Sequence, residues 1–376
     1  MKKILCFFGA CVLSTNLVVA SPLISLGTNN GASIYFDGFA STAYSSNITL
    51  ASQDELDDFI FTVSPGLELI LGEGQTIYTA SLEARNNITR YLDNDEFDAE
   101  NWNINGNLSY QSERLRASAG AFFRERQEND SLIREERTLV KIEEFGGNVN
   151  GRYTLSPRTA IASGFSYRNV EFDRGTNRDR EIYTVPVTAF YEVTQRIDAT
   201  AGFRYRETEV TGSEDSTDLF YNVGLTGEVT PRLSTELSVG LQERSFSGDR
   251  SSRSTLGLES RSSFAATDKS IFRLRLNRDF ETAGQGDSVL STGGELVYVF
   301  LYDPFLNFQA SAAYRELDYQ NRARKDDNYR VGGSANYSFA EYYTVTGSYR
   351  YRVNDSNFGL AEYTDHTVTL ALRMRY

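Results

Sequence analysis

Long runs in which apolar and polar residues alternate are the feature that most constrains the fold of this chain. The carboxy-terminal run is the clearest, and its apolar face consists of Val368, Leu370, Leu372, Met374 and Tyr376. Similar alternation occupies residues 233–242, 272–277 and 343–353. A period of two residues indicates a β-strand with two different faces. The runs are about 10 to 14 residues long, which predicts unusually long strands.

The connections between these runs recur at a regular interval. Short turns and longer charged loops alternate, and equivalent positions in successive turns lie 36 to 38 residues apart, as shown by Pro157, Gln195, Pro231, Asp268, Pro304 and Tyr342. Each repeat therefore contains two strands, one turn and one loop. About eight turns and nine loops can be recognised, which predicts about 18 strands.

Two fold classes contain many two-faced strands: a soluble sandwich or propeller, and a membrane barrel. Soluble strands average about 5–6 residues, whereas a strand that crosses a bilayer needs about 9–11. The body of the chain has no apolar stretch long enough for a membrane helix. We therefore predict an all-β, up-and-down antiparallel transmembrane barrel in the outer membrane of a Gram-negative bacterium. Its short turns and both termini are expected in the periplasm, and its longer loops outside the cell.

The amino terminus has the features of a secretory signal peptide. Lys2 and Lys3 precede an apolar run, and we place cleavage after Ala20. Acylation of Cys11, as in a lipoprotein, is the alternative. We expect residues 1–20 to be the signal peptide, 21–32 a short periplasmic segment and 33–376 the barrel.

Composition narrows the possible chemistry. Cleavage after Ala20 removes both cysteines, and His366 is the one histidine of the chain. A thiol nucleophile, a Cys-ligated metal and a multi-histidine metal site are thereby excluded from the mature chain. The net charge of −13 argues against a nucleic-acid partner. We predict no catalytic residue, no metal and no cofactor.

The polar faces of the strands carry many arginines, and in a barrel these faces line the lumen. The side chains expected to line the lumen are Arg116, Arg124, Arg204, Arg206, Arg273, Arg275, Arg315, Arg330, Arg350, Arg352, Tyr35, Phe122 and Phe190. We expect fewer acids on the same faces, such as Glu236, Glu259 and Glu295, and hence a basic wall that favours anions. Cross-strand pairing of arginine with glutamate, which would leave a passive wall, is the alternative.

The sequence offers no plug domain, and its longest loop candidate, Gln127–Glu136, is short and charged. Eighteen strands enclose a water-filled interior unless something fills it. We therefore expect a wide tube lined by side chains, suited to bulky cargo such as a polymer.

Two segments resemble a known family. Residues 341–352, followed by Asn354-Asp355-Ser356 and the terminal strand, and residues 274–280, are similar to the putative β-barrel porin 2 family, outer-membrane barrels associated with exopolysaccharide biosynthesis. The resemblance implies an 18-stranded pore that completes polysaccharide export beside a periplasmic polysaccharide-export protein. Separately, the alternating Val368, Leu370, Leu372, Met374 and Tyr376 resemble the signal that the bacterial barrel-assembly machinery recognises.

The leading functional hypothesis is a passive conduit for an anionic exopolysaccharide. Its expected partners are the periplasmic export protein, the barrel-assembly machinery, the lipopolysaccharide and other lipids of the outer membrane, and the polysaccharide itself. A general or oligosaccharide-uptake diffusion porin is the alternative. An enzyme or a structural adhesin is the third hypothesis.

Overall fold

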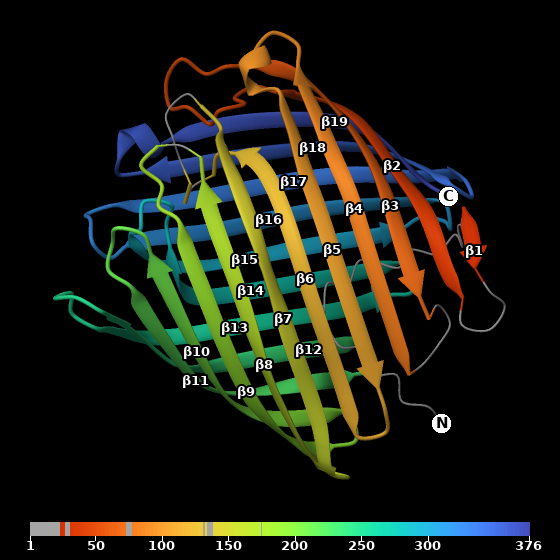
Figure 1. The fold of residues 1–376 in the computed structure, drawn as a ribbon, viewed down its shortest axis with the longest axis vertical. Coiled ribbons are helices and arrows are strands. Elements are labelled where there is room, and N and C mark those ends of the chain that lie inside the picture. Colours follow the sequence, from red (N-terminus) through yellow and green to blue (C-terminus); the bar gives the residue numbers. More distant parts are fainter. Residues whose placement is uncertain (1–22, 27–30, 73–76, 131, 134–137, 174) are drawn as a thin grey trace.

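The computed structural model describes residues 23–26, 31–72, 77–130, 132–133, 138–173 and 175–376. The expected signal peptide lies outside the described residues. Within the described part, eighteen long strands form one closed antiparallel barrel, in which each strand pairs with its sequence neighbours and β19 pairs with β2 (Figure 1). The predicted fold class and strand number are confirmed.

The strands are 13 to 17 residues long, slightly longer than the sequence predicts. The first nine are β2 (Ala32–Ser45), β3 (Asp58–Leu71), β4 (Tyr78–Tyr91), β5 (Ala99–Gln111), β6 (Leu115–Glu128), β7 (Val140–Ser156), β8 (Thr159–Phe172), β9 (Arg180–Thr194) and β10 (Ile197–Val210). The last nine are β11 (Ser216–Thr230), β12 (Leu233–Phe246), β13 (Arg253–Thr267), β14 (Ser270–Thr282), β15 (Ser288–Leu301), β16 (Leu306–Tyr319), β17 (Lys325–Ala340), β18 (Tyr343–Ser356) and β19 (Tyr363–Arg375).

Short turns join the strands at one end of the barrel, and longer loops join them at the other. Several turns have only two residues, such as Pro231-Arg232 between β11 and β12. Two residues are enough to join neighbouring antiparallel strands. Two 3-10 helices, η1 (Asp95–Phe97) and η2 (Gly359–Ala361), lie in the loops. None of the helices among the described residues is long and apolar enough to cross a membrane.

The barrel closes along the pairing of β19 with β2, which runs from Thr367 and Ser45 to Arg375 and Asp37. At the turn end of this seam the carboxy terminus lies near β1 (Ile24–Leu26) (Figure 1). Tyr376 and Phe36 exchange two backbone hydrogen bonds, of 2.9 and 2.7 Å. Below this point β2 extends beyond the end of β19, and β1 (Ile24–Leu26) pairs with the free edge through Ile24 and Ile34. The segment 21–32 therefore contributes a strand that covers an otherwise open edge.

Alternation sorts the side chains onto two faces, as the sequence predicts. Large apolar side chains such as Val63, Val149, Val223, Leu256 and Leu370 are more than half exposed on the outer face. In water such a surface would be unfavourable, but it matches the hydrocarbon of a bilayer. The polar face is turned inward, and the functional features of the barrel lie there.

Candidate functional site: the lumen

All thirteen side chains predicted to line the lumen lie on the inward face. The strand register shows this, because residues that lie directly opposite each other in neighbouring strands share one face of the sheet. Arg204, for example, lies opposite Phe220, and Arg330 opposite Arg352. The inward residues are Arg116, Arg124, Arg204, Arg206, Arg273, Arg275, Arg315, Arg330, Arg350, Arg352, Tyr35, Phe122 and Phe190. What they bind stays a prediction.

A network of buried charges joins strands β10, β11 and β12 near the loop end. Arg244 holds Asp218 in a two-pronged ion pair, with Nε to Oδ1 at 2.6 Å and Nη2 to Oδ2 at 2.7 Å. The two residues are each only 1% exposed. Arg206 donates a further hydrogen bond of 2.8 Å to Asp218. Such fork geometry satisfies both carboxylate oxygens and offsets the cost of removing the charges from water.

Asp279 links this network to its own strand, β14, which lies four strands from β10 in the sheet. It accepts hydrogen bonds from Arg204 (2.9 Å), from Arg206 (3.0 and 3.1 Å) and from Gln242. Pairing between β13 and β14 stops at Arg278, so the end of β14 leaves β13. The loop end of β14 is therefore drawn toward β10 and across the interior.

The loop between β14 and β15, residues 283–287, makes contact with loops from the other side of the barrel. The backbone of Gly284 donates to the Leu132 carbonyl (2.8 Å) and accepts from the Arg178 amide (2.7 Å). Arg180 of β9 also donates to the Ala283 carbonyl, at 3.2 Å. Gly286 has a φ of +85°, a conformation that favours glycine. The loop 283–287 thus reaches from β14 and β15 to the loops that follow β6 and β8.

Leu132, in the loop after β6, packs against two walls of the lumen. It contacts the buried cluster of Ile133, Val140, Ile142 and Val170 on the side of β7 and β8. It also contacts the cluster of Ala283, Val289, Leu317 and Tyr319 on the side of β15 and β16. We call Leu132, Ile133 and residues 283–287 the crossbar.

The crossbar corrects the expectation of a wide, open tube. The loop after β6 is short, as predicted, but Leu132 and Ile133 fold into the lumen because burying two apolar side chains is favourable. Side chains that face the lumen near the loops are consequently buried. Val140, Val289 and Leu317, for example, are 0% exposed. Near the turns the lumen is open, since the side chains of Arg275 and Arg261 are 70% and 60% exposed.

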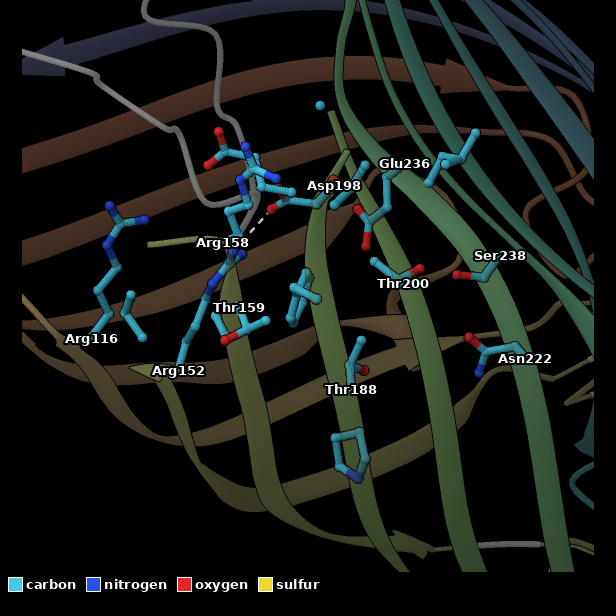
Figure 2. A pocket seen from close by; sticks show the side chains of 18 of the residues that line it. Arg116, Arg152, Arg158, Thr159, Thr188, Asp198, Thr200, Asn222, Glu236 and Ser238 are labelled. Carbon is cyan, nitrogen blue, oxygen red and sulfur yellow. Dashed lines mark hydrogen bonds and ion pairs between the residues drawn. The ribbon is translucent and has the colours of Figure 1, made fainter. Parts of the chain in front are cut away.

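The open half contains a cavity of about 590 Å³ beside strands β6 to β13. Figure 2 shows arginines on one side, among them Arg116 and Arg152, and Thr200, Asn222 and Ser238 on the other. Arg152 is held by Asp198 at 3.1 Å and lies 4.0 Å from the ring centre of Phe190. The turn residues Pro157 and Arg158 also line the cavity, so it lies at the turn end of the barrel.

The predicted arginines differ in their partners. Arg204, Arg206, Arg275, Arg315 and Arg352 form ion pairs with lumen acids. Within the described part of the chain, no ion pair is found for Arg116, Arg124, Arg273, Arg330 or Arg350. Pairing with acids, the alternative, therefore applies to part of the wall, and the preference for anions stays a prediction.

The lumen contains more acids than the sequence predicts. Asp218, Asp279, Glu281, Asp326 and Asp365 also face inward and bind arginines. Their odd or even position in each strand could be read from the sequence. They lie close to the loops, however, where the ends of the strands are hard to predict. These acids compensate part of the positive charge in the loop half of the lumen, whereas Arg124, Arg330 and Arg350 there, and Arg116 and Arg273 near the turns, have no ion pair to a described residue.

The terminal strand has the two faces that its pattern predicts. Val368, Leu370, Leu372 and Tyr376 are exposed on the outer face, and Met374 shares that face through its register. Tyr376 packs edge-on against Tyr342, with ring centres 5.1 Å apart. Its use as an assembly signal stays a prediction.

Comparisons with known proteins agree with this architecture. A family model described as Putative beta-barrel porin 2 matches residues 39–376. No curated protein matches the sequence. Crystal structures of Pseudomonas aeruginosa OccK2 (OpdF) and OpdO share the fold, with TM-scores of 0.51 and 0.50 at 10% and 11% identity. Each alignment covers 92% of this chain, and 98% and 97% of the two porins. The chain therefore belongs to the Putative beta-barrel porin 2 family and is an outer-membrane β-barrel porin.

Proposed function

We propose that this porin is a diffusion channel for the uptake of small anionic solutes. The crossbar is the observation that carries the proposal. Leu132 contacts both the β7–β8 wall and the β15–β16 wall, so the loop half of the lumen is narrowed by packed side chains. A path of this kind suits small solutes better than a polymer, which favours the uptake alternative over polysaccharide export.

The preference for anions is supported by the arginines that lack an acidic partner among the described residues. Arg116, Arg273 and Arg330 all face the lumen, and Arg330 is exposed there. Guanidinium groups bind carboxylates and phosphates in a two-pronged geometry. One structure of OccK2, a porin that shares this fold, is in complex with glucuronate, which is a small organic acid.

Deletion of the gene in its host tests the proposal. We expect slower growth when a small organic acid is the scarce carbon source, with growth restored by a plasmid copy. Surface and secreted polysaccharide should stay at the parental level. Polymer that is lost from the surface or trapped in the periplasm, and restored by the plasmid, would instead establish the export conduit.

A further inference from the structure

We infer that the cavity at the turn end is a binding site for a sugar acid, that is, a carboxylate that carries several hydroxyl groups. The inference rests on the proposed function and adds a site and a ligand class to it. The cavity measures about 590 Å³ and is lined by residues of strands β6 to β13. This volume lies in the range typical of small-molecule sites, roughly 300–1,000 Å³.

Arg116 supplies the cation for the carboxylate. It faces inward from β6, opposite Arg152 of β7. Among the described residues it has neither an ion pair nor a hydrogen bond from its side chain, whereas Arg152 is held by Asp198 and by the ring of Phe190. A guanidinium without a protein partner beside a cavity retains its fork of donors for a ligand carboxylate.

The opposite side of the cavity offers neutral hydrogen-bonding groups. Thr200, Asn222 and Ser238 come from the successive strands β10, β11 and β12 and line the same cavity (Figure 2). Their side chains have no hydrogen-bond partner within the described part of the chain. Hydroxyl and amide groups both donate and accept, which is what the hydroxyls of a sugar require.

A glycine in β10 leaves room for the Asn222 side chain on this side of the cavity. Gly202 lies opposite Asn222 in the register of β10 and β11. A Cβ at Gly202 would come within 2.7 Å of the Asn222 amide oxygen. The glycine therefore lets the Asn222 side chain lie over the neighbouring strand, facing the cavity.

Other ligand classes fit these groups less well. An aromatic acid would need bare apolar surface, but guanidinium groups lie over the rings of Phe190 and Phe220. An amino acid would leave Thr200, Asn222 and Ser238 without hydrogen-bond partners, because it does not carry several hydroxyl groups. Arg116 facing three neutral polar groups matches a hydroxylated anion.

Binding of D-glucuronate to the purified protein in detergent micelles, measured by calorimetry, tests the site. Glucose lacks the carboxylate and hexanoate lacks the hydroxyls, so both should bind much more weakly. Arg116→Gln should weaken glucuronate binding about tenfold, because a charge-assisted hydrogen bond is lost. Asn222→Ala should weaken glucuronate but leave hexanoate unchanged. Arg253→Gln, at the loop end of β13, is the matched control and should bind glucuronate as the parent does.

Equal binding of glucuronate and hexanoate, or equal effects of Arg116→Gln and Arg253→Gln, would overturn the inference. The measurement does not depend on conduction, so failure of the site and failure of the proposed uptake are separable. A pore that conducts anions but binds no glucuronate would refute the site alone. A short uronate oligosaccharide distinguishes the sources: binding of the monomer only indicates a free sugar acid, and equal binding indicates an acidic polysaccharide unit.

Discussion

At the scale of single residues, the lumen contains two kinds of arginine. Arg244 and Arg206 are locked to Asp218 in a buried network, whereas Arg116 and Arg273 face the lumen with no ion pair to a described residue. The first kind fixes the shape of the barrel wall. The second kind leaves positive charge available to solutes.

Removal of the buried carboxylate should be costly. Asp218→Asn is expected to lower the free energy of unfolding by about 3 kcal/mol, because Arg244 would remain buried without its counter-charge. Glu295→Gln is the control, with an expected loss below about 1 kcal/mol, since its partner Arg275 is 70% exposed and water screens the pair. Urea titration of the protein in lipid vesicles measures both, and equal losses would contradict the network's structural role.

Ion selectivity should depend on the arginines without ion pairs. The triple replacement of Arg116, Arg273 and Arg330 by Gln is expected to shift the reversal potential in a salt gradient toward cations. A double replacement of Arg275 and Glu295 by Gln removes one charge of each sign, so selectivity should not change. A triple variant that keeps the parental reversal potential would show that these arginines do not set selectivity.

Alternation in the sequence was sufficient to place every predicted lumen residue on the correct face, because parity decides the direction of a side chain in a strand. It was not sufficient to identify partners. Arg206 binds Asp279 from a strand four positions away, a contact that requires β14 to leave β13. No local pattern encodes that bend.

At the scale of elements, the crossbar changes the character of the lumen. The sequence indicated the place and length of the loop after β6 but favoured a solvated loop because of its charges. Leu132 and Ile133 form an apolar pair between those charged residues. This pair was the one sign in the sequence that the loop folds into the lumen. Its burial depends on Val140, Val289 and Leu317, which come from three separate strands.

Weakening the crossbar should widen the pore. Replacing both Leu132 and Ile133 by Ala is expected to raise single-channel conductance and to cost about 2 kcal/mol or more in stability. Leu92→Ala provides the control, because Leu92 is a loop residue with 60% of its surface exposed. Unchanged conductance in the double variant, with the protein folded, would mean that the crossbar does not limit the path.

The terminal strand should matter for assembly. Deletion of Tyr376 removes two backbone hydrogen bonds to Phe36 and the ring contact with Tyr342. We expect less folded barrel in the outer membrane, measured by the mobility shift of unheated samples in gels. Tyr302→Ala, which truncates another exposed tyrosine in a turn, should assemble normally. Equal yields from both variants would remove the special role of Tyr376.

At the scale of the whole molecule, the repeat of two strands, one turn and one loop determines a closed barrel with an even number of strands. Closure leaves no free edge in the membrane, which is why so polar a chain can span it. The repeat does not determine how wide the path is, because that depends on which loops fold inward. The structure adds this information, and it turns the expected open tube into a barrel narrowed near its loops.

The size limit of permeation tests this account most directly. Vesicles that contain the purified porin should swell when the external solute is a monosaccharide or a sugar acid. They should not swell in oligosaccharides of increasing length, since the crossbar narrows the loop half of the lumen. Rapid permeation of long oligosaccharides would contradict the account and would indicate an open conduit for polymers.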